Sequence, residues 1–265
     1  MNVDGTNIQP LSDTSEAVDY ASISPDGKHI AFITGYPRSP AYRVDSLMVM
    51  DRDGGNKRLL TKTPAAYPSW SPNSQSVAFA VVLHSPGSSY YGIFTIGLDG
   101  SGEKRVSNIL GSYHLSGWFR DYRLLGGVAQ DTLDGTKYVN GCYIFLMDTM
   151  GNITSRWGGG GAASWSGMGS HDGKHIAFIS TKSGTRCVYL LNVENNRDSL
   201  ILRDQNDFFK EPVAFSPDDT QLLYNAGGSG LGKMRIVDLR TGAVKDITPF
   251  KDDTTTCLAV SWGRN

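Results

Sequence analysis

Short apolar runs alternate with polar, turn-forming residues along the whole chain, and the first clear case spans residues 21–33. Small and apolar residues alternate at its start, Pro-Asp-Gly follows at positions 25–27, and apolar residues return from Ile30 to Ile33. Proline presets the φ angle of the first turn position and glycine accepts a positive φ angle. The stretch therefore predicts two antiparallel strands joined by a tight turn.

The same pattern of strand, turn and strand returns four more times along the chain. The first turn residues of the five copies are Ser24, Ser71, Phe119, Ser170 and Ser216, so successive copies are 47, 48, 51 and 46 residues apart. A period of this length indicates an array of one repeated structural unit.

Each copy continues with a third apolar run, a polar turn and a fourth run, as residues 47–51, 52–56 and 57–61 show in the first copy. Four short antiparallel strands form one blade, which exposes an apolar face on each side and cannot bury either face alone. Such blades stack around an axis. Almost no segment has the period of apolar residues that a helical repeat needs. The sequence therefore predicts an all-β chain folded as a β-propeller.

The two ends of the chain carry parts of a further unit. Residues 258–263 match the first strand of a blade, because Ser261 and Trp262 align with Ser69 and Trp70. Residues 1–11 match the end of a third strand and a fourth strand. We predict one domain over residues 1–265, a six-bladed propeller whose sixth blade is closed by both termini and incomplete in this chain; the alternative is a five-bladed ring with surplus end strands. The complete blades are expected at about residues 20–61, 68–107, 116–156, 163–203 and 212–248.

The incomplete blade leads to two further expectations. The natural chain is expected to extend upstream of Met1 by the missing strands. If the blade is also incomplete in the folded protein, its unpaired strand edges are open to another chain, so we expect self-association through them.

Bulk composition narrows the classes of partner. The net charge is −1 and no Lys/Arg-rich block is present, so nothing favours nucleic acid or a membrane surface as partner. No apolar run reaches the length of a transmembrane helix. Cys142, Cys187 and Cys257 have no CxxC spacing and predict buried thiols rather than disulfides or a zinc site.

The repeated Trp/Phe-Ser-Pro-Asp-Gly-Lys-x-Ile-Ala-Phe, followed by Asp-x-Asp-Gly-x-Asn, resembles the TolB-like, or WD40-like (PD40-repeat), propellers of bacteria. The resemblance implies a six-bladed fold in the cell envelope, in the periplasm or on an exported lipoprotein, while the residues themselves leave the cytoplasm open. It does not specify function, because such blades occur in TolB, in envelope lipoproteins, in oligogalacturonate lyase-like enzymes and in peptidase gating domains.

Motifs for catalysis or cofactors are weak in this sequence. Residues 227–233 resemble a phosphate-binding loop, but Met234 stands where Ser or Thr is needed and no helix follows. His84 and His114 are expected in loops on one face of the ring, where a metal site would also need carboxylates. No G-x-S-x-G motif is present, and we expect no cofactor.

The long connections between second and third strands, and between blades, share one face of the predicted ring, which we call the long-loop face. Aromatic and charged residues on variable loops over a rigid scaffold are typical of a recognition surface. The candidate ligand-binding residues are Tyr36, Arg38, Tyr42, Arg43, His84, Tyr90, Tyr91, His114, Asp131, Lys137, Tyr138, Phe208 and Phe209.

The sequence thus predicts a non-catalytic binding module that takes a protein, glycan or peptide ligand at the long-loop face and axial channel. The alternative is an enzyme of the oligogalacturonate lyase type, in which His84 and His114 would contribute to a histidine-bound metal.

Overall fold

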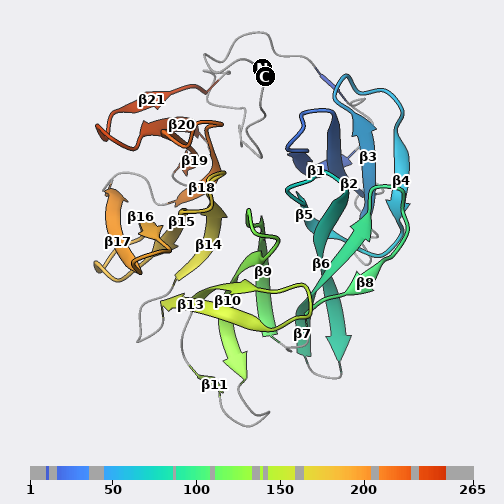
Figure 1. Cartoon of the computed structure of the whole chain (residues 1–265), viewed down its shortest axis with the longest axis horizontal. Helices are drawn as coiled ribbons and strands as arrows, with labels where there is room; N and C mark the ends of the chain where they lie inside the picture. The colour runs from blue at the N-terminus through green and yellow to red at the C-terminus, as the bar shows by residue number, and fades with distance from the viewer. Residues whose placement is uncertain are drawn as a thin grey trace.

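The computed structural model describes residues 10–11, 17–35, 45–85, 88–107, 111–132, 138–139, 143–158, 164–203, 209–227 and 233–248, with only the backbone at several strand ends. Within these ranges all regular structure is β-strand, and the strands form five sheets with antiparallel pairing. Figure 1 shows the sheets arranged around a common centre as the blades of a propeller. The predicted all-β propeller is confirmed.

The strands of each blade pair in chain order from the axis outward. The first blade contains β1 (Ala17–Ile23), β2 (His29–Gly35), β3 (Asp45–Asp51) and β4 (Arg58–Thr61). The second contains β5 (Ala66–Trp70), β6 (Ser76–Ser85), β7 (Ser88–Gly97) and β8 (Lys104–Arg105). The third contains β9 (Gly111–Trp118), β10 (Leu124–Thr132), β12 (Tyr143–Met147) and β13 (Ile153–Gly158), with the short β11 (Tyr138–Val139) paired to the end of β10.

The last two described blades repeat this order. The fourth contains β14 (Ser164–Gly169), β15 (His175–Ser180), β16 (Cys187–Asn192) and β17 (Arg197–Leu202). The fifth contains β18 (Phe209–Phe215), β19 (Gln221–Gly227), β20 (Lys233–Asp238) and β21 (Val244–Asp246). The first strands β1, β5, β9, β14 and β18 surround the centre of Figure 1 and contact one another in that sequence. We call them the inner strands.

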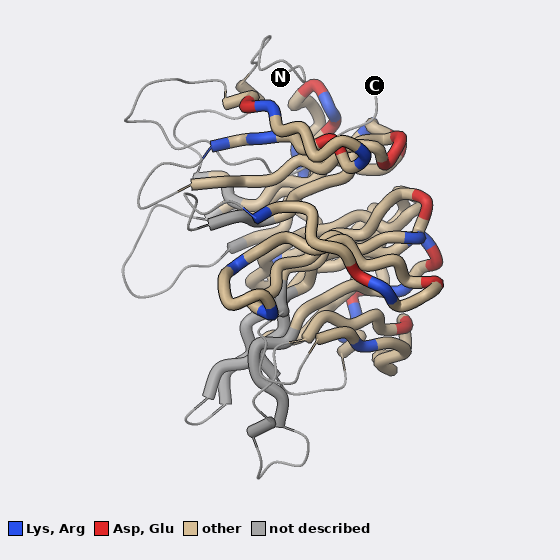
Figure 2. Tube along the Cα trace, turned by 90° about the vertical axis from the view of Figure 1, so that its left-hand side faces the viewer, with Lys and Arg blue, Asp and Glu red and all other residues tan. Residues whose placement is uncertain are grey.

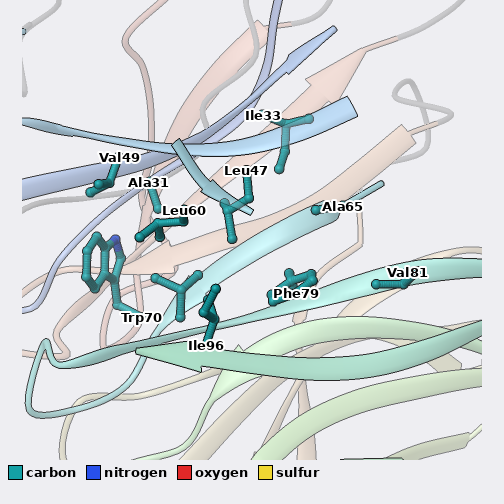
Figure 3. Packing of buried hydrophobic residues seen from close by; sticks show 11 residues of the cluster. Ala31, Ile33, Leu47, Val49, Leu60, Ala65, Trp70, Phe79, Val81 and Ile96 are labelled. Atoms are coloured by element: carbon teal, nitrogen blue, oxygen red, sulfur yellow. The ribbon is translucent and has the colours of Figure 1, made fainter. Parts of the chain in front are cut away.

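Apolar clusters between neighbouring blades form the core. Figure 3 shows the first of them, in which Ala31, Ile33 and Leu47 of the first blade face Trp70 and Phe79 of the second. Equivalent clusters join the second blade to the third, the third to the fourth and the fourth to the fifth. Because burying one large apolar side chain contributes about 1.5–3 kcal/mol, the stacking of blades is the main source of stability.

One face of the first blade and one face of the fifth have no other described blade against them. On the first blade, Ile30, Phe32 and Met50 form an apolar cluster in which Phe32 is only 1% exposed. Leu11 packs against this cluster. Gly54 and Gly100 are the equivalent turn glycines of the first and second blades. A β-carbon added to Gly54 would lie 3.3 Å from the carbonyl oxygen of Leu11, and one added to Gly100 would lie 3.6 Å from the carbonyl oxygen of Leu60 in β4. Leu11 therefore contacts the turn of the first blade in the way that Leu60, on the outermost strand of the first blade, contacts the turn of the second blade.

The interpretation of residues 1–11 as a fourth strand stays a prediction, because only residues 10 and 11 of that segment are described. The rest of that segment and residues 258–263 lie outside the described residues. The described residues form five blades, the number in the alternative reading of the sequence, and no sixth blade is formed among them.

The remaining bulk expectations concern thiols and membrane spans. Cys187 is buried and takes part in no disulfide within the described residues, as predicted, and Cys142 and Cys257 lie outside the described residues. Within the described ranges, the chain has no helix with the length and hydropathy to cross a membrane.

Candidate functional site

Some of the residues predicted for ligand binding lie outside the described part of the chain. These residues are Tyr36, Arg38, Tyr42, Arg43, Lys137 and Phe208. For His84, Tyr90, His114, Asp131, Tyr138 and Phe209 the backbone is described. Tyr91 is the one member of the predicted set with a described side chain; it is half-buried and packs against the core between the second and third blades.

The expectation that His84, Tyr90 and Tyr91 lie in a long connection between strands is wrong. Strands β6 and β7 continue as a paired hairpin, with His84 opposite Ser89, Leu83 opposite Tyr90 and Ser85 opposite Ser88. Cross-strand pairing satisfies the backbone donors and acceptors that a loop would leave to water, so the hairpin simply extends. The two histidines are not in loops, because His84 lies in β6 and His114 lies in β9 opposite Gly127.

Other predicted residues also lie at strand ends rather than in loops. Asp131 of β10 pairs with Val139, Tyr138 of β11 pairs with Thr132, and Phe209 of β18 pairs with Gly227. Among the described residues no group of three or more His, Cys, Asp or Glu side chains is placed to hold a metal ion. The resemblance of residues 227–233 to a phosphate-binding loop also has a plain explanation, because Ala226 and Lys233 are paired residues of antiparallel β19 and β20.

Every inner strand contains an irregularity that the sequence did not reveal. The pairing between first and second strands shifts by one residue at Tyr20, Tyr67, Ser116, Ser166 and Val213. Tyr20, Tyr67 and Ser166 each stand four residues before the first turn residue and have φ angles of 47°, 54° and 46°. Such β-bulges turn a side chain out of the regular alternation.

Two of these bulge residues form an aromatic pair between the first and second blades. The ring centroids of Tyr20 and Tyr67 are 4.5 Å apart with an interplanar angle of 54°, and their hydroxyl oxygens are 3.5 Å apart. Tyr20 is 42% exposed, while Tyr67 also packs against the core between the second and third blades. A positive φ angle costs a side chain as large as tyrosine about 1–2 kcal/mol, and strain of this kind concentrates at functional sites.

Sequence reasoning missed this pair, although one signal for it exists. In the aligned repeats the position four residues before the turn holds Tyr20 and Tyr67 in the first two blades and Ser166 in the fourth. From the sequence, a tyrosine on an inner strand is predicted to be a core residue, because regular alternation would direct its side chain against a neighbouring blade. Only the bulge shows that the side chain points elsewhere.

Hydroxyl groups of the inner strands connect neighbouring blades near the bulges. The Trp118 amide donates to the Ser69 hydroxyl at 3.2 Å, and the Gly167 amide donates to the Ser116 hydroxyl at 3.1 Å. The Trp70 indole nitrogen donates to the Ser22 carbonyl oxygen at 2.9 Å. These bonds therefore tie the inner strands of neighbouring blades to one another.

The opposite face carries the turns between first and second strands and between third and fourth strands, and we call it the short-turn face. Figure 2 shows many of the acidic and basic residues gathered along its right-hand edge. In the first blade the Ser24 hydroxyl donates to Asp26 at 2.6 Å and accepts from the His29 amide at 2.9 Å. The same two bonds recur around Ser71, Ser170 and Ser216, so the repeated motif builds a rigid turn.

The turn carboxylates are stabilised in the charged form. Burial raises the pKa of Asp26, but hydrogen bonds from Ser24 and Lys28 outweigh it, and the net pKa is below the usual 3.8. Burial likewise raises the pKa of Asp172, and bonds from Ser170 and Lys174 bring it below 3.8.

Acid is therefore expected to destabilise the fold. The unfolded carboxyls bind protons near pH 4 while the folded ones bind them at lower pH, so the stabilisation is complete above this range and is lost as the pH falls through the folded pKa values. We expect the unfolding temperature, followed by circular dichroism, to drop progressively below about pH 4. The Asp26→Asn variant, which copies Asn73 of the second blade, should show a shallower drop; an unchanged slope would contradict this account.

Turns of neighbouring blades are also bonded to each other. In each of the four turns that begin with serine, the residue that follows the turn aspartate or asparagine has a positive φ angle. In chain order these residues are Gly27, Ser74, Gly173 and Asp219. Ser74 accepts from the Asp26 amide of the preceding blade at 3.1 Å. Asp219 accepts from the amides of His171 and Asp172, both at 2.8 Å, and from the His171 ring at 2.9 Å. These bonds assign the short-turn face a structural role.

A shallow depression lies on the short-turn face of the first blade, lined by Gly27, Lys28, His29, Asp51, Arg52 and Asp53. The carboxylate of Asp51 lies 3.2 Å from the His29 ring nitrogen and accepts from the side-chain amide of Asn56 at 2.6 Å. The Asp53 carboxylate accepts from the Gly55 amide. Both acidic groups are thus used to build the hairpin, in agreement with the reading of this stretch as a turn.

No family model matches the chain, and neither does any curated protein sequence. The fold is similar to that of TolB from Acinetobacter baumannii, with a TM-score of 0.68 and 18% identity over 89% of this chain and 55% of that one. A putative TolB from Agrobacterium tumefaciens gives a TM-score of 0.71 and 16% identity, over 93% of this chain and 86% of that one. The chain thus spans little more than half of the Acinetobacter protein.

An oligogalacturonate lyase in complex with manganese has a TM-score of 0.59 and 14% identity, over 87% of this chain and 67% of that one. Identities this low concern the fold alone. The chain has a TolB-like β-propeller fold, and the same architecture carries both TolB and an enzyme.

Proposed function

We propose that this chain is a non-catalytic binding module that takes its ligand at the axial channel and the long-loop face, in the bacterial cell envelope. The observation that supports it most directly is the exposed Tyr20 ring, held against Tyr67 on the inner strands. An exposed aromatic side chain on a rigid wall gives large contact area with little loss of side-chain entropy on binding.

The remainder of the proposed surface is the set of aromatic and charged residues of the long-loop face. Arg38 and Arg43 are the members most suited to a test, because arginine is enriched at binding hot spots and its charge can be reversed. The similarity of the fold to TolB supports the envelope as the compartment and a protein as one class of partner.

The test is affinity capture from a bacterial envelope extract, with the bound proteins identified by mass spectrometry. The variant Arg38→Glu/Arg43→Glu is expected to lose the proteins that the unmodified chain captures. Its matched control is Lys28→Glu/Lys174→Glu, which makes the same change in net charge with two exposed lysines on the short-turn face. Loss in the first variant alone supports the proposal, and equal capture by both variants and the unmodified chain would remove the long-loop arginines from the site.

A further inference from the structure

We infer that the short-turn face of the third blade is a docking site for a protein segment that carries an apolar side chain next to a carboxylate. The site consists of Arg120, Tyr122 and Met150, and we call it the third-blade patch. It lies on the face opposite to the long-loop face, so it is a second site beside the proposed one. Two exposed apolar side chains and one arginine charge support it.

The two exposed apolar side chains lie in adjacent turns of the third blade. Among the described residues, the exposed large apolar side chains lie on strands, except Tyr122 and Met150. Tyr122 is 46% exposed in the turn between β9 and β10, and Met150 is 72% exposed in the turn between β12 and β13. These turns are adjacent because Leu124 and Met147, the strand residues next to them, are paired. Single exposed apolar side chains are common on soluble proteins, whereas two in one place indicate an interaction site.

The repeat does not require apolar residues at these two positions. Tyr122 stands three residues after the first turn residue, where the other described blades have glycine, serine or aspartate. Met150 stands at the tip of the turn between third and fourth strands, where the other blades have an exposed charged residue. The equivalent residues in chain order are Gly27, Ser74, Gly173 and Asp219 at the first position, and Asp53, Asp99, Glu194 and Arg240 at the second. The blade architecture therefore does not account for the apolar pair of the third blade.

The Tyr122 ring is held in place from within its own blade. It contacts the Trp118 ring edge-on, with the centroids 6.4 Å apart and an interplanar angle of 78°. Trp118 in turn packs against the core between the second and third blades. Tyr122 makes no described hydrogen bond to the turn of a neighbouring blade, which is the contact that Ser74 and Asp219 make from the equivalent positions. A ring fixed on one side and exposed on the other gives contact area at low entropic cost.

Arg120 gives the patch a positive charge that no acid of the surrounding turns neutralises. Its exposed guanidinium donates to the Asp172 carbonyl oxygen at 3.3 Å, and it forms no ion pair with a described residue. The acids nearby are engaged within their own turns. Asp121 pairs with Arg123 at 2.7 Å, and Asp148 accepts hydrogen bonds from the backbone and a side chain of its own hairpin. A carboxylate on a partner therefore has Arg120 as its complement.

The composition of the patch favours a protein partner. Tyrosine, methionine and arginine are enriched in protein interfaces, and methionine adapts its shape to different side chains. An apolar side chain of the partner can cover Tyr122 and Met150 while an adjacent Asp or Glu pairs with Arg120. A membrane surface fits less well, because the two turns carry two acidic and two basic residues and so have no net positive charge to attract anionic lipids.

The probe for this site is a phage-displayed library of random dodecapeptides, selected on the purified chain. We expect enrichment of peptides in which an apolar residue stands next to Asp or Glu. A synthetic peptide of the enriched sequence is then titrated by calorimetry. Tyr122→Ser, which copies Ser74, and Met150→Asp, which copies Asp53, are each expected to weaken its binding at least about tenfold, while circular dichroism shows the same folded chain.

The variant Arg120→Gln tests the charged part of the site separately. Replacing the Asp or Glu of the peptide with Asn or Gln should weaken its binding to the unmodified chain about tenfold. The same replacement should have little further effect on the Arg120→Gln variant, because the pair is then already broken. An equal loss with both chains would show that the carboxylate does not pair with Arg120, and would overturn the inference.

The matched control is Leu59→Ser, because Leu59 is 42% exposed on the outermost strand of the first blade and its loss should leave the affinity unchanged. Enrichment of basic peptides or of none, equal affinity in the Tyr122 and Met150 variants, or an equal loss in the Leu59 variant would each overturn the inference. Dimerisation in light scattering, or binding to phosphatidylglycerol vesicles, that Met150→Asp abolishes would overturn it in favour of a second copy or a membrane.

Discussion

Replacing Phe79 with alanine is expected to lower the free energy of unfolding by about 3–5 kcal/mol. Phe79 lies in β6 with none of its surface exposed, inside the cluster that joins the first blade to the second. Its ring stacks on Phe94 of β7, with the centroids 5.8 Å apart. The change removes apolar burial and leaves a cavity that strands held in register on both sides cannot easily close.

The measurement is urea unfolding of the variant and the unmodified chain, followed by circular dichroism. Leu59→Ala is the matched control, because Leu59 lies on the outermost strand β4 with 42% of its surface exposed, and its loss should cost less than about 1 kcal/mol. A similar cost for both substitutions would show that the contact between blades is not the main source of stability.

Replacing Asp219 with alanine is expected to cost about 2–4 kcal/mol. The carboxylate accepts two amide hydrogen bonds and one from the His171 ring, so alanine leaves three donors of the fourth blade without their acceptor. Alanine at this position also keeps a φ angle of 57°, which an L-residue tolerates poorly.

Glycine separates the two effects, because it accepts the φ angle but makes no bond. Asp219→Gly should therefore be more stable than Asp219→Ala by about 1 kcal/mol, and still less stable than the unmodified chain. Ser74→Gly at the equivalent position of the second blade breaks a single bond, to the Asp26 amide, and should cost less than either. Equal stability of Asp219→Ala and the unmodified chain would show that the turns are not joined through this carboxylate.

The candidate site was predictable from the sequence only in part. The recurrence near Ser24, Ser71 and Ser170 was visible because turn chemistry involves a few adjacent residues, and the short turns form as expected. The extension of β6 and β7 through His84 and Tyr90 was not visible, because residues in a loop and residues in a paired hairpin can have the same composition. Cross-strand partners decide between the two, and they come from another part of the chain.

The sequence by itself determined the blade architecture of this protein. A repeat near 47 residues, with turn residues at constant places and apolar runs between them, specifies strands through local φ preferences and the need to bury apolar faces. Only the tertiary structure decided where the alternation breaks. The bulges at Tyr20 and Tyr67 arise from the pairing with the second strand of each blade, and the two rings meet because stacking places side chains 47 residues apart in contact. Such a contact depends on the packing of two whole blades, so no stretch of local sequence could show it.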